Sequence, residues 1–144
     1  MSTNSQFAIG IHLLMLLAYT PDESLTSEYM AASVNTNPVF IRRILGKLAD
    51  VGLVTSQPGV GGGWRLNRAP QGITLLEVYQ AVDEGHLLAM HPKPNPDCLI
   101  GRNIQRTLTL YFDEAQRAFE ERLARQTVAE VLETAREDLS ARPI

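Results

Sequence analysis

Apolar and polar positions follow two different periods along the first half of the chain, and these periods predict helices followed by a hairpin. Residues 6–19 are almost continuously apolar, which is typical of a helix packed on several sides. Residues 53–56 and 64–66 predict two short strands, joined by a glycine-rich turn at 58–63. Before this hairpin, apolar residues at helical spacing predict an amphipathic helix over 38–51, with a core face of Phe40, Ile41, Ile44, Leu45, Leu48 and Val51.

Residues that start and stop helices divide this region further. Thr26 is expected to cap a second helix, which Asn35 ends after about two turns. Asn37 can cap the helix that follows, and Pro38 suits its first position, where a missing N–H costs nothing. Gly52 can end that helix in the left-handed conformation that glycine tolerates. Two helices, a tight connection and a β-hairpin in this order predict a winged helix-turn-helix, a fold that points to DNA as the partner.

The second half of the chain predicts further helices around an irregular loop. Thr74 and Glu77 form a capping-box pattern for a fourth helix. Prolines exclude helix from the loop at residues 86–97, and a last helix is expected after Thr127. Between them, a long helix is expected over residues 101–126, with an apolar stripe at Ile104, Leu108, Tyr111, Ala115, Phe119 and Leu123.

This long helix needs a partner surface, because a chain of 144 residues offers it little core of its own. We expect a two-fold dimer to cover the stripe; the alternative is that the helix folds back on its own domain. The predicted fold class is mostly α with a small β-wing. Residues 1–84 would form a winged helix-turn-helix DNA-binding domain, residues 85–100 an irregular loop and residues 101–144 a helical dimerisation region.

The distribution of charge along the chain supports DNA as a partner in one segment only. The chain has a formal net charge of −3, which argues mildly against nucleic acid as a partner. Between residues 38 and 68, however, Asp50 is the one acidic residue among five basic residues: Arg42, Arg43, Lys47, Arg65 and Arg68. Phosphate attraction is screened beyond about 8–10 Å at physiological salt, so a basic patch on an acidic body is compatible with DNA binding.

Other classes of function find less support. Gly59–Gly63 could cradle a phosphate, but the lysine and helix of a phosphate-binding loop do not follow it. No nucleophile–base pair or carboxylate–histidine set has useful spacing, so we do not expect an enzyme. Cys98 is the only cysteine, which excludes an internal disulfide. The apolar run at 9–18 is far shorter than the ~20 residues that span a bilayer, so we expect a cytoplasmic protein without a membrane partner.

Several segments of the chain resemble a known family. Residues 40–48, the wing at 59–66 and the Ile-Thr-Leu-Leu sequence at 73–76 are similar to bacterial winged-helix regulators typified by IscR and NsrR. Residues 35–39 and 95–101 resemble the YwnA-like branch more closely. The resemblance implies dimeric transcription factors, mostly repressors. It also implies that many relatives sense iron–sulfur status or nitric oxide through a 2Fe–2S cluster.

The chain departs from this pattern at two places that matter for function. Cluster-binding relatives carry three cysteines in the loop after the fourth helix, whereas residues 85–101 hold Cys98 alone. Iron–sulfur clusters require thiolate ligands, so we expect no cluster, no metal site and no other cofactor. In the wing, Pro58 stands where relatives often carry an arginine, so contact with a narrow minor groove should be weaker or shift to Arg65.

Candidate DNA contacts lie at the start of the third helix and around it. Arginine can grip guanine with two hydrogen bonds, and valine can pack on a thymine methyl group, so base contacts are expected from Asn37, Val39, Arg42 and Arg43. Phosphate and wing contacts are expected from Thr26, Ser27, Lys47, Gly61, Gly62 and Arg65.

These assignments have plainer structural alternatives. Arg42 and Arg43 could form an ordinary solvated face, and the wing glycines could serve turn geometry alone. Trp64 is expected to cover the wing rather than to stack on a base. Cys98 could be inert, a thiol sensor, or the remnant of a lost cluster site.

The sequence therefore predicts a homodimeric, sequence-specific transcriptional regulator, of repressor type and without a cluster, that binds double-stranded DNA at a near-palindromic operator. A redox regulator acting through Cys98 is one alternative. A winged-helix module that binds a protein partner is another, and the basic face of the third helix argues against it. The signal that controls the regulator is left open.

Overall fold

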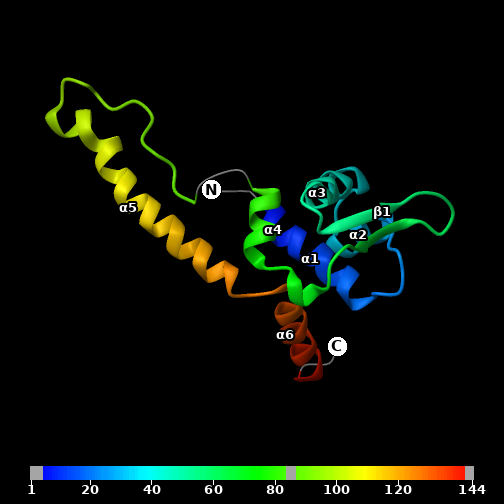
Figure 1. The fold of residues 1–144 in the computed structure, drawn as a ribbon. Helices are drawn as coiled ribbons and strands as arrows, with labels where there is room; N and C mark the ends of the chain where they lie inside the picture. The colour runs from blue at the N-terminus through cyan, green and yellow to red at the C-terminus, as the bar shows by residue number, and fades with distance from the viewer. Residues whose placement is uncertain (1–4, 84–86, 142–144) are drawn as a thin grey trace. The chain divides into compact units, whose positions relative to one another are not determined.

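The computed structural model describes residues 5–83 and 87–141, and this part of the chain is mostly helical with one small sheet (Figure 1). The elements in chain order are α1 (Gln6–Tyr19), α2 (Ser27–Val34), α3 (Pro38–Asp50), β1 (Val54–Gln57), β2 (Gly63–Leu66), the 3-10 turn η1 (Pro70–Gly72), α4 (Leu75–Val82), α5 (Leu99–Ala124) and α6 (Val128–Ala141).

The chain forms two compact units, which are described separately. Residues 1–84 and 124–144 make up the winged unit, and residues 85–123 make up the loop–α5 unit. The predicted domain boundary at residues 84 and 85 lies outside the described residues. The predicted helical region of 101–144 is divided, because α6 packs against α1 in the winged unit while α5 belongs to the other.

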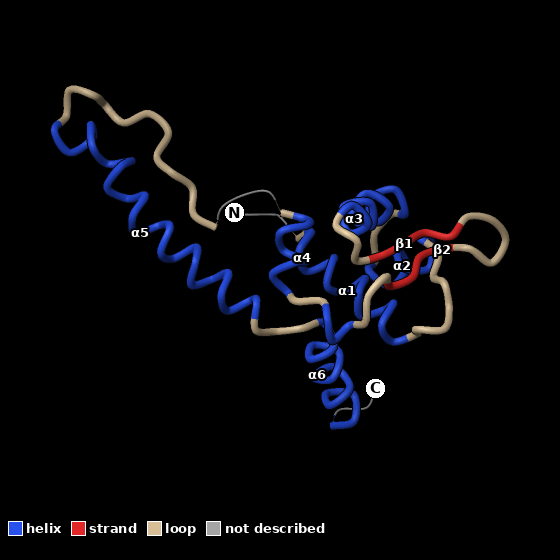
Figure 2. Tube along the Cα trace, in the orientation of Figure 1, coloured by secondary structure: helices blue, strands red, loops and turns tan. Residues whose placement is uncertain are grey.

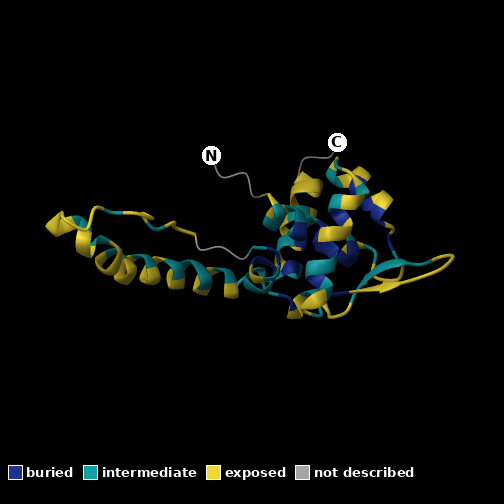
Figure 3. Cartoon of the chain, turned by 90° about the horizontal axis from the view of Figure 1, so that it is seen from above, coloured by how far each residue is buried: buried dark blue, intermediate teal, exposed yellow. Residues whose placement is uncertain are grey.

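The core of the winged unit lies between α1, α2, α3, α4 and α6. Its buried residues are dark blue in Figure 3. Leucines of α1 and the inner face of α3 are fully buried there, and burying such side chains contributes about 1.5–3 kcal/mol each. The predicted inner face of α3 is confirmed at Ile41, Ile44, Leu45 and Leu48. It is wrong at Val51, which is 51% exposed because the helix ends at Asp50 and the left-handed Gly52 (φ 79°) turns the chain away.

Side-chain caps fix the start of both helices of the helix-turn-helix. The Tyr29 N–H donates to Oγ1 of Thr26 over 3.1 Å, and the Phe40 N–H donates to Oδ1 of Asn37 over 2.8 Å. Asn35 adopts the left-handed conformation (φ 65°) and makes the turn between α2 and α3. The predicted caps are therefore confirmed, and α3 begins one residue after Asn37.

The wing is an antiparallel pair in which Val54 faces Leu66 and Gln57 faces Gly63 (Figure 2). A further bridge extends this sheet. Leu25 and Trp64 exchange two backbone hydrogen bonds of 3.0 and 2.8 Å, which attach β2 to the residues just before α2. A Cβ on Gly63 would lie 2.6 Å from the Leu25 oxygen, so only glycine fits at this approach. The wing is thereby attached to the start of α2.

The start of α4 is joined to the start of α6. The Leu75 N–H donates to the Gln126 oxygen and the Val128 N–H donates to the Ile73 oxygen, each over 2.9 Å. At the same place, Thr74 and Glu77 form the predicted capping box. This ladder holds the C-terminal helix in the winged unit.

The loop–α5 unit has no fully buried residue in α5, which begins at Leu99, within two residues of the predicted start. The Leu87 N–H donates to Oε1 of Gln116, and Nε2 of Gln105 donates to the His91 oxygen, so the loop lies along α5. The loop covers the side of the stripe that carries Phe112, whereas Tyr111, a predicted stripe residue, is 65% exposed. The half-buried stripe residues are Ile104, Leu108, Phe112, Phe119 and Leu123.

An ion pair near the start of α4 should make stability depend on pH. Nη2 of Arg68 lies 2.6 Å from Oε2 of Glu77. Burial raises the pKa of Glu77, but the hydrogen bonds from Arg68 and from the Thr74 backbone, with the Arg68 charge, outweigh it and lower the pKa below its usual 4.5. A carboxyl group whose folded-state pKa is lowered stabilises the fold above its unfolded-state pKa, and this contribution is lost as pH falls through the folded-state pKa.

We therefore expect the free energy of unfolding to decrease as pH falls below about 4.5, and to decrease less in Glu77→Gln, which has no charge to lose at this position. Urea denaturation at a series of pH values would measure both. The two proteins differ at residue 77 alone, so the difference between their pH dependences isolates Glu77. Parallel curves would contradict this assignment.

Candidate nucleic-acid interface

The outer side of the first two turns of α3 is exposed and carries the predicted base-reading residues. Val39 is 61% exposed, and Arg42 and Arg43 also lie on the surface. Helical spacing separates them from Ile41 and Ile44, which are fully buried. The structure thus brings Val39, Arg42 and Arg43 to one exposed end of α3.

The two arginines differ in their surroundings. Nη1 of Arg42 lies 3.3 Å from Oε1 of Glu28 in α2. Arg43 forms no hydrogen bond or ion pair with any described residue. Glu28 is not among the predicted site residues, because the pair joins two helices over 14 positions of the sequence and leaves no local pattern.

The two cap residues keep part of their hydrogen-bonding capacity for a ligand. Oδ1 of Asn37 accepts the Phe40 N–H, which leaves the Nδ2 amide group as a donor. Oγ1 of Thr26 accepts the Tyr29 N–H, which leaves its O–H as a donor. Both residues are exposed. Each can therefore donate to a phosphate or a base edge while it caps its helix.

The Ser27 side chain lies inside the protein and not at the predicted phosphate surface. It is only 6% exposed, and its Oγ accepts the Nε1–H of Trp64 over 3.3 Å. The expectation that the Ser27 hydroxyl contacts a phosphate is therefore wrong. The backbone N–H groups at the start of α2 are the donors that remain for a phosphate. Trp64 is half-buried against the core, as expected of a residue that covers the wing.

Several of the predicted basic side chains are held by neighbours. Nζ of Lys47 donates to Oε1 of Gln6 over 2.9 Å and is half-buried, so it lies on the α1 side of α3. Nε of Arg65 donates to Oγ of Ser24, and its Nη2 donates to the Asp22 oxygen. Arg65 therefore ties the wing to the residues before α2.

The wing glycines are required by the turn itself. Gly61 has φ 76°, and a Cβ on Gly62 would lie 2.1 Å from the Gln57 oxygen. The geometric reason for these glycines is thus sufficient, whether or not the backbone also approaches DNA. Val60, between them and Gly59, is fully exposed at the tip.

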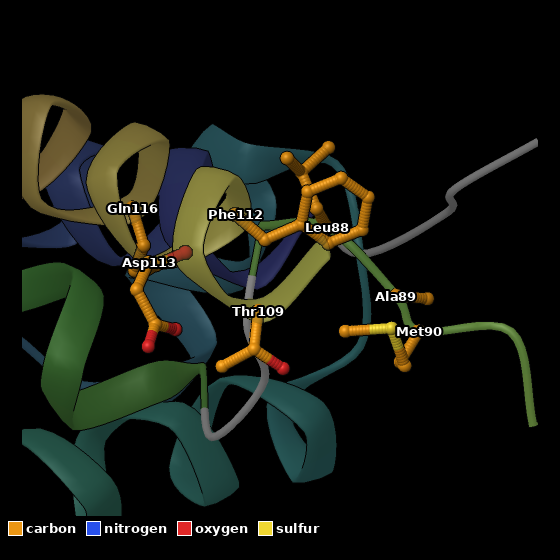
Figure 4. Close-up of a pocket in the computed structure, with 7 residues that line it drawn as sticks. All are labelled: Leu88, Ala89, Met90, Thr109, Phe112, Asp113 and Gln116. Carbon is orange, nitrogen blue, oxygen red and sulfur yellow. The ribbon is translucent and has the colours of Figure 1, made fainter. Parts of the chain in front are cut away.

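The loop–α5 unit contains a pocket of about 420 Å³ and the single cysteine. Cys98 is exposed directly before α5, where its Sγ accepts the Gly101 N–H over 3.3 Å. Figure 4 shows the pocket between the loop and α5, with the apolar walls Leu88, Met90 and Phe112 and the polar residues Thr109, Asp113 and Gln116.

These features define the structural class of the protein. A short capped helix, a turn, an exposed basic helix and a hydrogen-bonded hairpin together form a winged helix-turn-helix. The chain belongs to the Rrf2 family, whose model is described as an iron-dependent transcriptional regulator and matches residues 3–134. Its relatives are transcriptional regulators, which are not enzymes.

Relatives and solved structures agree with this family. A proposed HTH-type transcriptional regulator, YwnA of Bacillus subtilis (strain 168), is 43% identical over 130 residues, or 90% of this chain and 96% of that protein. A crystal structure of a proposed transcriptional regulator from Lactobacillus plantarum has a TM-score of 0.78 at 27% identity, covering 94% of this chain and 90% of that chain. IscR of T. potens shares the fold, with a TM-score of 0.69 at 20% identity over 94% and 88% of the chains. The resemblance to IscR-type regulators and to YwnA is confirmed.

As a cluster, the iron named in the family description would need more thiolate ligands than this chain offers. Cys98 is the only thiol in the sequence. In residues 5–83 and 87–141, no three histidine, cysteine or acidic side chains gather as a metal site would require. We therefore assign no step to iron.

None of the helices in residues 5–83 and 87–141 combines the length and the apolar character that a membrane span requires.

Proposed function

We propose that this protein is a homodimeric, sequence-specific DNA-binding regulator that represses transcription at a near-palindromic operator in the cytoplasm and works without an iron–sulfur cluster. The observation that carries the proposal is the exposed start of α3, where Val39, Arg42 and Arg43 project from a helix held rigidly by its cap and its buried face. Membership of a family of transcriptional regulators supports DNA as the partner.

In this proposal the start of α3 enters the major groove. The Arg43 guanidinium group can donate two parallel hydrogen bonds to O6 and N7 of guanine, and Val39 can pack on a thymine methyl group. Thr26, the N-terminal N–H groups of α2 and the wing backbone then meet the phosphates on either side. Lys47 adds a peripheral positive charge. A dimer bound over a promoter would exclude the polymerase, which is why we assign repression.

Removal of either arginine should weaken binding by the amount of a base contact. We expect Arg43→Ala and Arg42→Ala to lower affinity for the operator by ~10- to 100-fold and to relax the preference at one base position each. The operator duplex would be selected from a random library with the wild-type protein, and affinity measured by fluorescence anisotropy. Arg106→Ala, which removes the same charge from an exposed position on α5, is the control. Unchanged base preferences in both α3 variants would refute the assignment.

The dimer is proposed from the side of α5 that the loop leaves open. Ile100 is 74% and Tyr111 is 65% exposed, and Ala115 and Ala118 continue this open side at helical spacing. Exposed apolar residues in a row along a helix mark an interface with another molecule. A second copy of α5 would cover them and would give the two winged units the two-fold symmetry of a near-palindromic operator.

A charge on this open side should separate the subunits. We expect Tyr111→Glu to weaken dimerisation by about 100-fold or more, because an unpaired carboxylate would be buried at the interface. Arg106→Glu is the control, since Arg106 is an exposed polar residue about 140° round the helix from Tyr111. Sedimentation equilibrium would measure both, and equal dissociation of the two variants would place the interface elsewhere. Nuclease footprinting should show two half-sites about one helical turn, or a multiple, apart.

Redox control through Cys98 is the second candidate function, because this exposed thiol lies at the start of the proposed dimerisation helix. Peroxide would oxidise the thiol to a sulfenic acid, which would condense with the partner's Cys98 to form a disulfide and release water. We expect a covalent dimer on non-reducing electrophoresis that disappears with dithiothreitol and in Cys98→Ser. An unmodified thiol after peroxide treatment, with DNA affinity equal to that of Cys98→Ser, would show that Cys98 is inert.

A third candidate function is a winged-helix module that binds a protein partner. The salt dependence of binding to duplex DNA distinguishes this candidate from a DNA-binding regulator. Binding to duplex DNA through phosphates weakens steeply as salt rises, and its absence at low salt would favour the protein-binding reading.

A further inference from the structure

We propose that Glu28 is a specificity-determining residue of the DNA-binding surface: it holds Arg42 in position for a base and opposes binding to DNA without the operator sequence. This inference rests on the proposed function, since it assigns a role within the same surface. It begins from the contact between Oε1 of Glu28 and Nη1 of Arg42, at 3.3 Å.

The pair joins the first turn of α2 to the second turn of α3, on the surface that is proposed to meet DNA. Glu28 lies two residues after the exposed cap Thr26. The Glu28 side chain is 69% exposed and that of Arg42 is 47% exposed, so the pair contributes little to the stability of the fold. It does place a carboxylate on the surface where phosphates are proposed to bind.

The geometry of arginine allows this contact and a base contact at the same time. The guanidinium group is planar and has five N–H donors, and the contact with Glu28 engages Nη1. The remaining donors are available for O6 and N7 of a guanine. Because one end of the plane is held, Arg42 loses less conformational freedom when it reaches the base.

The charge of Glu28 acts in the opposite direction on nonspecific complexes. On DNA that lacks the right base, Arg42 would turn towards a phosphate and leave Glu28 unpaired beside the negatively charged backbone. In the operator complex Glu28 keeps its partner and this repulsion is reduced. Glu28 would therefore disfavour nonspecific DNA more than the operator, which raises the ratio of the two affinities.

Four variants separate these effects. Glu28→Gln removes the charge and weakens the hold on Arg42, whereas Glu28→Asp keeps the charge but shortens the side chain by one methylene. Glu23→Gln removes a carboxylate from the exposed residues before α2, outside the pair. The double variant Glu28→Gln/Arg42→Ala tests whether Glu28 acts through Arg42. Each would be titrated with the selected operator duplex and with a scrambled duplex of equal length at two salt concentrations.

We expect Glu28→Gln to bind the scrambled duplex several-fold more tightly than wild type, and the ratio of operator to scrambled affinity to fall by roughly fivefold to tenfold. Glu28→Asp should keep the wild-type affinity for the scrambled duplex and lose part of its affinity for the operator. In the Arg42→Ala background, Glu28→Gln should leave the ratio unchanged.

Two results would overturn the role proposed for Glu28, and a third would overturn the proposed DNA-binding function as well. If Glu28→Gln changes both affinities by the same factor, as Glu23→Gln is expected to do, Glu28 adds only general charge. If Glu28→Gln lowers the ratio equally in the Arg42→Ala background, Glu28 does not act through Arg42. If the wild-type protein selects no duplex at low salt, the proposed function fails and this inference fails with it.

Discussion

The close backbone approach between Leu25 and Trp64 is the contact on which the surface around α2 and the wing depends. Two backbone hydrogen bonds join these residues, and the space at Gly63 admits no side chain. The same approach positions the Trp64 ring over Ser27 at the start of α2. The wing is therefore hydrogen-bonded to the residues just before α2. The starts of the helices and the wing consequently form one continuous surface.

Charge on this surface is distributed more selectively than the composition suggests. The sequence between residues 38 and 68 is strongly basic, yet Arg65, Arg68 and Lys47 each contact a neighbouring side chain or backbone oxygen. Arg43 makes no such contact among the described residues. Structural pairing thus leaves Arg43 as the basic side chain of this segment without such a contact among the described residues, at the exposed start of α3. In the proposed function, this distribution would favour base contacts over general attraction to phosphate.

Local signals made most of the helix-turn-helix predictable. The caps at Thr26 and Asn37 and the inner face of α3 follow from residues within one or two turns, and they were predicted correctly. Features that depend on distant residues were not. Ser27 is a hydroxyl residue at the start of a helix, where phosphates often bind. Its hydroxyl is nevertheless buried, because it accepts a hydrogen bond from Trp64, 37 residues away. In the same way, Phe112 and not Tyr111 packs in the loop–α5 unit because a loop without periodic pattern covers one side of the stripe.

The division of the chain into two units has a consequence for which substitutions the winged unit tolerates. The winged unit takes residues from both ends of the sequence, and its C-terminal helix is joined to α4 by backbone hydrogen bonds. The loop–α5 unit is therefore an insertion between two segments that already pack together, and α5 contributes no buried residue. Substitutions in the loop therefore leave the buried core of the winged unit untouched. The exposed side chains of the loop, Cys98 among them, could change without altering how α3 is packed and capped.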